Sequence, residues 1–124
     1  MTFLAVVLGG ALGAPSRWLL DRWVTARRGG SFPWGTFVIN SSGSLLLGLL
    51  LGAAAAGGPS ALVVALVGTG FCGAFTTFST FGFETVRLAE ERAYGAAAAN
   101  VVLSLGVGLA LAAVGWSLGH ALWT

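Results

Sequence analysis

The longest uncharged stretch of this chain runs for 55 residues, from Gly29 to Phe83. A soluble domain has about one charged residue in four, and one membrane-crossing helix needs only about 20 apolar residues. The stretch is therefore long enough for two crossings. The whole chain is 56% hydrophobic and 8% charged, with a mean hydropathy of +0.90. These features together predict an all-α integral membrane protein.

Turn signals divide the chain into four predicted membrane spans. Residues 24–32 contain the pair Gly29-Gly30 and are expected to form a loop. The turn Gly57-Gly58-Pro59-Ser60 ends the second span, and Ser60 suits the N-cap of the third. The spans predicted within a single domain, 1–124, cover residues 2–23, 33–56, 61–90 and 95–121. They would leave no room for a nucleotide-binding or catalytic module.

A break is predicted in the third span, near residues 73–80. The stretch Gly70-Phe-Cys-Gly-Ala-Phe-Thr-Thr-Phe-Ser-Thr-Phe-Gly-Phe-Glu84 places four hydroxyls among glycines and phenylalanines. None of these residue types is a strong helix former. Non-helical backbone at membrane depth is tolerated only where protein buries it or where it lines a wet cavity. We therefore expect two half-helices here, and the break is the first candidate for a functional site.

Polar side chains in the other spans indicate what kind of ion this site would favour. Arg17 is expected to face a vestibule, a helix interface or the headgroups, because an arginine in lipid is costly. Asn40 would either bind an ion or bond a neighbouring helix. Asn100 and Ser104 are four residues apart and share one stripe of the fourth span. A carboxylate at membrane depth would indicate a cation or proton path, and the uncharged runs contain none. These polar residues together therefore favour a small anion.

Three phenylalanines, Phe75, Phe78 and Phe81, recur every three residues across the predicted break. The edge of an aromatic ring carries partial positive charge, so a row of such edges would attract a small anion. The same residues would also be expected in a packed core, where aromatic side chains dominate the packing. From the spacing alone, the core is the plainer interpretation.

Several classes of function are disfavoured by what the chain lacks. It has no CxxC, HExxH or P-loop motif and no nucleophile–base constellation, so we expect neither enzyme activity nor an organic cofactor. Its single cysteine, Cys72, is read as a small packing residue. The isoelectric point near 9.5 rests on six basic against four acidic residues, an excess too small to indicate nucleic-acid binding.

Three motifs in order resemble those of the Fluc fluoride channels, also called the CrcB family. They are Gly9-Gly-Ala-Leu-Gly-Ala-Pro-Ser-Arg17, Pro33-Trp-Gly-Thr-Phe-Val-Ile-Asn40-Ser-Ser-Gly43 and Gly70-Phe-Cys-Gly-Ala-Phe-Thr-Thr-Phe-Ser-Thr-Phe81 followed by Glu84. The resemblance covers all four spans. It implies a passive channel in a bacterial inner membrane that exports fluoride and relieves its toxicity, built as an antiparallel dimer with two pores.

The same resemblance implies roles for individual residues. Those that would line the fluoride pore are Asn40, Phe78, Ser79, Thr80, Phe81 and Ser104. Arg17 would attract anions to a vestibule. The backbone carbonyls of Gly73 and Thr76 would hold a structural sodium ion at the dimer centre. Asn100 stands where relatives place a tyrosine, and Gly108 replaces a hydroxyl, so the polar track of the fourth span is thinner here.

The distribution of charge leaves the dimer partner open. Arginines flank only the side of the membrane that holds the two loops after the first and third spans. The positive-inside rule then favours both termini outside, whereas an antiparallel homodimer needs both orientations. An oppositely oriented paralogue is the alternative partner, which would make this chain half of a heterodimer and inactive alone. A small multidrug-type exporter is the other alternative, but it would require an intramembrane glutamate that the first span lacks.

Overall fold

The computed structural model describes all 124 residues, Met1–Thr124, and its regular elements are all helical. In chain order they are α1 (Thr2–Arg28), α2 (Trp34–Ala55), α3 (Ala61–Val63), the π-helical stretch η1 (Val64–Cys72), α4 (Gly73–Phe75), α5 (Phe78–Glu90) and α6 (Tyr94–Trp123). Four stretches are long and apolar enough to cross a membrane: Thr2–Arg28, Trp34–Ala55, Ala61–Glu90 and Tyr94–Trp123. The chain is therefore a multi-pass membrane protein, as predicted.

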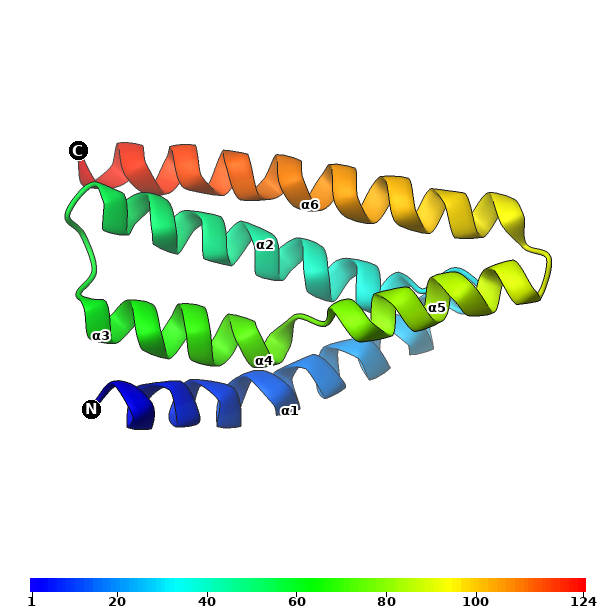
Figure 1. The fold of residues 1–124 in the computed structure, drawn as a ribbon, viewed down its shortest axis with the longest axis horizontal. Helices are drawn as coiled ribbons and strands as arrows, with labels where there is room; N and C mark the ends of the chain where they lie inside the picture. The colour runs from blue at the N-terminus through cyan, green and yellow to red at the C-terminus, as the bar shows by residue number, and fades with distance from the viewer.

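The four spans form an elongated bundle (Figure 1). Both termini lie at one end, together with the turn between α2 and α3. The α1–α2 loop and the α5–α6 turn lie at the opposite end. Ser60 caps α3 as expected, because its hydroxyl accepts the Val63 N–H at 3.3 Å.

The first helix is longer than predicted. Residues 24–28, which were expected to belong to the loop 24–32, are helical, so that part of the prediction was wrong. The helix continues through Pro15 to Arg28, and Gly29 and Gly30 then take φ angles of 57° and 81°, which glycine adopts without strain. Arg27 also lies over the ring of Trp23, with its guanidinium carbon 4.6 Å from the ring centroid. This pairing of residues four apart supports the extra helical turn.

The third span is broken at two residues. The stretch formed by α3, η1 and α4 ends at Phe75, and Thr76 and Thr77 have extended backbones with ψ angles of 159° and 121°. The chain resumes a helix at Phe78, with Thr77 as the N-cap of α5. Figure 1 shows the consequence, a change of direction that carries α5 away from the line of α4 and toward α6.

Glycines hold α2 and α6 close together. Gly48 and Gly52 face the backbone of Ala112 and Trp116, and Gly115 faces the backbone of Leu45. Small residues allow such close approach between membrane helices, where lipid removes the ordinary hydrophobic drive to associate. The third span packs differently on the two sides of its break. Before the break it packs mainly against α1, where Gly9 and Gly70 bring the two backbones together, and after the break α5 packs against α6.

Candidate functional site

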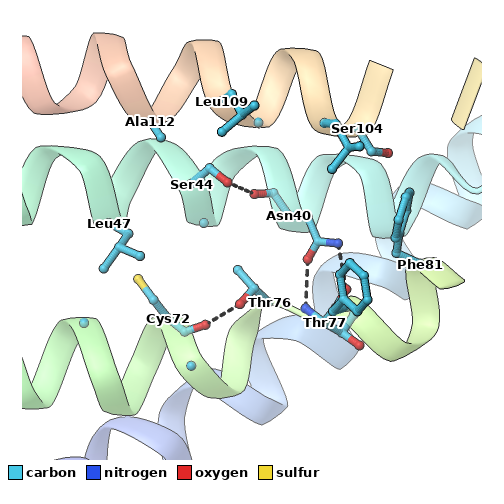
Figure 2. Close-up of a pocket in the computed structure, with 16 residues that line it drawn as sticks. Asn40, Ser44, Leu47, Cys72, Thr76, Thr77, Phe81, Ser104, Leu109 and Ala112 are labelled. Atoms are coloured by element: carbon cyan, nitrogen blue, oxygen red, sulfur yellow. Dashed lines mark hydrogen bonds between the residues drawn. The ribbon is translucent and has the colours of Figure 1, made fainter. Parts of the chain in front are cut away.

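Asn40 bonds directly to the exposed backbone of the break. Its Nδ2 donates to the Thr77 carbonyl at 2.8 Å, and the Thr77 N–H donates to its Oδ1 at 2.8 Å (Figure 2). The side chain thus supplies both partners that an extended residue would otherwise lack at membrane depth. An NH2 group carries two hydrogens, so one hydrogen of Asn40 is left for another acceptor. Of the two predicted roles, bonding to a neighbouring span is the contact observed.

Thr77 also caps the half-helix that follows it. Its hydroxyl accepts the Thr80 N–H at 3.2 Å and donates to Thr80 Oγ1 at 3.0 Å. Threonine is a good N-cap because its oxygen satisfies one of the first free N–H groups of a helix. Thr77 therefore uses its backbone to bond α2 and its side chain to start α5.

A groove of about 410 Å³ opens beside the break. Among its lining residues, Asn40 and Ser44 come from α2, Phe78 and Phe81 from α5, and Ser104 from α6. The phenylalanine rings have centroids 5.7 Å apart and are tilted by 48°. Four of the six predicted pore residues, Asn40, Phe78, Phe81 and Ser104, thus meet at one surface, and no carboxylate lines it.

The other two predicted pore residues lie elsewhere. Thr80 faces a second hollow of about 210 Å³, which also includes Arg17, Asp21 and Thr77. Since Thr77 lines both the groove and this hollow, the break forms a wall between them. Ser79 is exposed, and lines neither the groove nor this hollow.

A third hollow, of about 120 Å³, lies at the charged end of the bundle. Asp21 lines it as well as the second hollow, so the two share a wall. Glu84 and Arg87 of α5 are also among its lining residues. Arg87 donates to the Ser31 carbonyl at 3.2 Å and thereby ties the α1–α2 loop to α5. A series of adjacent hollows therefore leads from the charged end to the break, with Arg17 on its inner part.

Asn100 does not line the groove. It is 1% exposed and donates from Nδ2 to Thr85 Oγ1 at 2.9 Å. Ser104, which does line the groove, donates to Asn100 Oδ1 at 3.2 Å. The fourth-helix stripe predicted from the sequence is thus divided, with Ser104 facing the groove and Asn100 facing α5.

The break also divides the row of phenylalanines. Phe75, before the break, is 7% exposed and stacks on Phe71 with ring centroids 5.3 Å apart. Phe78, after the break, is 79% exposed. The packed-core interpretation therefore fits Phe75, whereas Phe78 and Phe81 line the groove.

Two carbonyls at the break lack their helical partners. In an unbroken helix the Gly73 carbonyl would accept the Thr77 N–H, but that N–H donates to Asn40. The Thr76 carbonyl would accept the Thr80 N–H, which donates to the Thr77 hydroxyl. Hard cations prefer oxygen ligands of this kind, and broken membrane helices use such carbonyls to coordinate sodium. The donor set of Gly73 and Thr76 therefore suits a sodium ion.

The family described as "CrcB-like protein, Camphor Resistance (CrcB)" has a model that matches residues 4–116. The chain belongs to the CrcB family. Curated relatives cover nearly all of it. One from Frankia casuarinae is 52% identical over 99% of both chains, and one from Streptomyces avermitilis is 50% identical over 99% of both. One from Nocardia farcinica is 54% identical over 88% of this chain and 75% of its own.

All three relatives bear the name fluoride-specific ion channel FluC 1. The resemblance seen in the sequence motifs is thereby confirmed. The name describes an ion channel and not an enzyme, in agreement with the absence of catalytic motifs from this CrcB chain.

Three residues of the site were not identified from the sequence. Thr77 was noticed only as one of four hydroxyls, although a threonine directly before a helix start is a recognisable N-cap signal. Thr85 lies between Glu84 and Val86, and nothing in its local sequence indicates a bond to the fourth span. Asp21 lies one turn after Arg17, and nothing in its local sequence shows that it separates two hollows.

Proposed function

We propose that this CrcB chain is a passive fluoride channel of a bacterial inner membrane, which relieves fluoride toxicity by letting the ion leave the cell. The observation that carries the proposal is the groove, which combines Phe78, Phe81 and a free hydrogen of Asn40 with no carboxylate. The names of relatives about 50% identical to the chain support the choice of ion.

Fluoride is a small, strongly hydrated anion that only accepts hydrogen bonds. Its passage requires groups that replace water, and amide hydrogens and aromatic edges both present positive charge to it. The remaining groove walls include Leu47, Leu105 and Leu109, and apolar walls offer nothing to a larger anion that sheds its water. Transport through this route needs no covalent step, so we propose no catalytic residue and no organic cofactor.

Arg17 would act before the groove is reached. It lies on the second hollow with Thr80 and Thr77, at the break. A fixed positive charge in a narrow hollow raises the local concentration of anions. We therefore assign Arg17 to the vestibule and Thr80 to its inner wall. Ser79, which faces neither the groove nor this hollow, would contribute only once a second chain is present.

A second chain is part of the proposal. Phe78 is 79% exposed on the open side of the groove, and an inverted copy would cover it and complete two pores. Two carbonyls from one chain are too few to enclose a cation, so Gly73 and Thr76 of both copies would hold the sodium ion. When bound, that ion supplies a fixed positive charge between the two breaks. The partner is either a second copy or an oppositely oriented paralogue.

Fluoride efflux from liposomes that contain only this purified chain tests the proposal. A fluoride electrode should record rapid loss of fluoride, and a chloride electrode should record none. Empty liposomes from the same lipid give the background. Absence of flux from a well-folded chain would indicate that an oppositely oriented partner is required. Absence of flux even with such a partner would refute the channel proposal.

A further inference from the structure

A chain of hydrogen bonds leads from the groove into the contact between α5 and α6. Ser104 bonds to Asn100 at 3.2 Å, Asn100 to Thr85 at 2.9 Å, and Thr85 to the Phe81 carbonyl at 2.8 Å. Its two ends, Ser104 and Phe81, line the groove. Its middle is enclosed, since Asn100 is 1% exposed.

The direction of this chain is fixed by its inner end. A threonine hydroxyl has one hydrogen, and Thr85 donates it to the Phe81 carbonyl. The group that faces Thr85 must then be a donor, which is the NH2 of Asn100. The Asn100 oxygen therefore faces Ser104, and Ser104 can only donate to it.

We propose that Asn100 sets the direction of the Ser104 hydroxyl and so weakens the anion site on the α6 wall. This inference rests on the proposed fluoride channel. With its hydrogen committed to Asn100, Ser104 presents lone pairs to the groove, and fluoride cannot donate to them. To bind fluoride, Ser104 must turn and leave a buried oxygen of Asn100 unpaired. The cost of an unpaired buried acceptor corresponds to roughly tenfold weaker binding.

A weak site has a use in a channel. Conduction requires that each site bind the ion well enough to admit it and weakly enough to release it. Asn100 touches no part of the groove, so it is a positioning residue that acts through Ser104. Its effect is to limit how long fluoride stays on the α6 wall.

The variant Asn100→Leu tests this role, alone and together with Thr85→Val. The paired change replaces both bonded partners by apolar groups of similar shape, which tends to be nearly neutral for stability. The freed Ser104 hydroxyl can then turn toward the groove without leaving a buried Asn100 oxygen unpaired. The fluoride concentration that half-saturates efflux should fall about tenfold. Adding Ser104→Ala to either variant should abolish that gain.

Thr85→Ser is the matched control. It retains the hydroxyl that fixes the direction of the Asn100 amide, so Ser104 should still donate to Asn100 and the half-saturating concentration should not fall. If Asn100→Leu leaves that concentration unchanged, or if the gain persists after Ser104→Ala is added, the inference is overturned.

A measurement on the side chain itself separates this inference from the proposed function. The chain has two asparagines, Asn40 and Asn100, so selective ¹⁵N-asparagine labelling gives two side-chain amide signals in a micelle NMR spectrum. Thr85→Val should shift the amide protons of Asn100 upfield and leave those of Asn40 in place. An unresponsive Asn100 signal would refute the hydrogen-bond chain even in a conducting protein. A responsive signal in a protein that conducts no fluoride would support the chain and refute the channel.

Discussion

The bond between Asn40 and the break supplies both partners of the extended Thr77 backbone at membrane depth. Replacing Asn40 by leucine retains the approximate volume of the side chain and removes both of its bonds to Thr77, each 2.8 Å long. The extended backbone of Thr77 has no helical partner to return to. We therefore expect Asn40→Leu to destabilise the broken span and not the α2–α6 pair.

The magnitude follows from the two backbone groups left unpaired. A buried donor or acceptor without a partner costs about 1–3 kcal/mol. Thr77 is half-buried, so water reaches part of it, and the lower half of that range applies to each group. The expected loss in free energy of unfolding is about 2–4 kcal/mol. Asn40→Asp would set a carboxylate oxygen against the Thr77 carbonyl at membrane depth, so it should cost at least as much as Asn40→Leu.

Reversible unfolding in mixed micelles, combined with amide hydrogen exchange, measures this effect. The Thr77 amide should exchange faster in Asn40→Leu, whereas amides in the middle of α6 should not change. Ser44→Ala is the control, because that hydroxyl on the same helix bonds only the Asn40 carbonyl of its own helix at 2.8 Å. A loss below about 0.5 kcal/mol, the lower limit for one hydrogen bond, with Thr77 still protected, would refute the reasoning.

Three further predictions concern other parts of the site. Phe81→Ile should abolish fluoride efflux while the protein elutes normally on size exclusion, and unchanged flux would rule out the aromatic-edge mechanism. Gly115→Val should cost about 1–3 kcal/mol of stability by overpacking, since a Cβ there would lie 2.5 Å from the Leu45 carbonyl oxygen. Gly106→Val is the control and should be tolerated, because a Cβ at Gly106 would have no atom within 4 Å. Arg17→Gln should slow fluoride efflux more at low than at high ionic strength, and an equal effect at both would argue against long-range attraction.

The sequence was sufficient to predict the number of spans and the place of the break. Both depend on local properties, namely runs of apolar residues and a cluster of poor helix formers between residues 70 and 84. The end of α1 was predicted too early because the loop signal of Gly29-Gly30 was extended back to residue 24. Arg27 instead continues the helix, with its guanidinium stacked on Trp23.

The site was predicted less completely because its contacts join residues far apart in the chain. Asn40 and Thr77 are 37 positions apart, and Asn100 and Thr85 are 15 apart. A sequence can show that an intramembrane asparagine needs a partner, but the choice among several hydroxyls and an exposed backbone depends on how the helices cross. For the same reason the spacing of Phe75, Phe78 and Phe81 could not show that the break separates the first from the other two.

The arrangement of charge gives a physical argument for pairing this chain with an inverted partner. All ten charged residues lie on α1 from Arg17 onward, on α5 or in the α5–α6 turn, and both helices finish at the same end of the bundle (Figure 1). The hollows that Arg17 and Asp21 line lie on the charged side of the break. Beyond the break, toward the termini, the groove is lined by apolar residues such as Leu47 and Ala112 (Figure 2). One chain thus offers an anion a polar approach from a single membrane surface. An inverted partner would bring its own charged end to the other surface, so that each surface would have one polar approach and the apolar half of each chain would lie beside the charged half of the other.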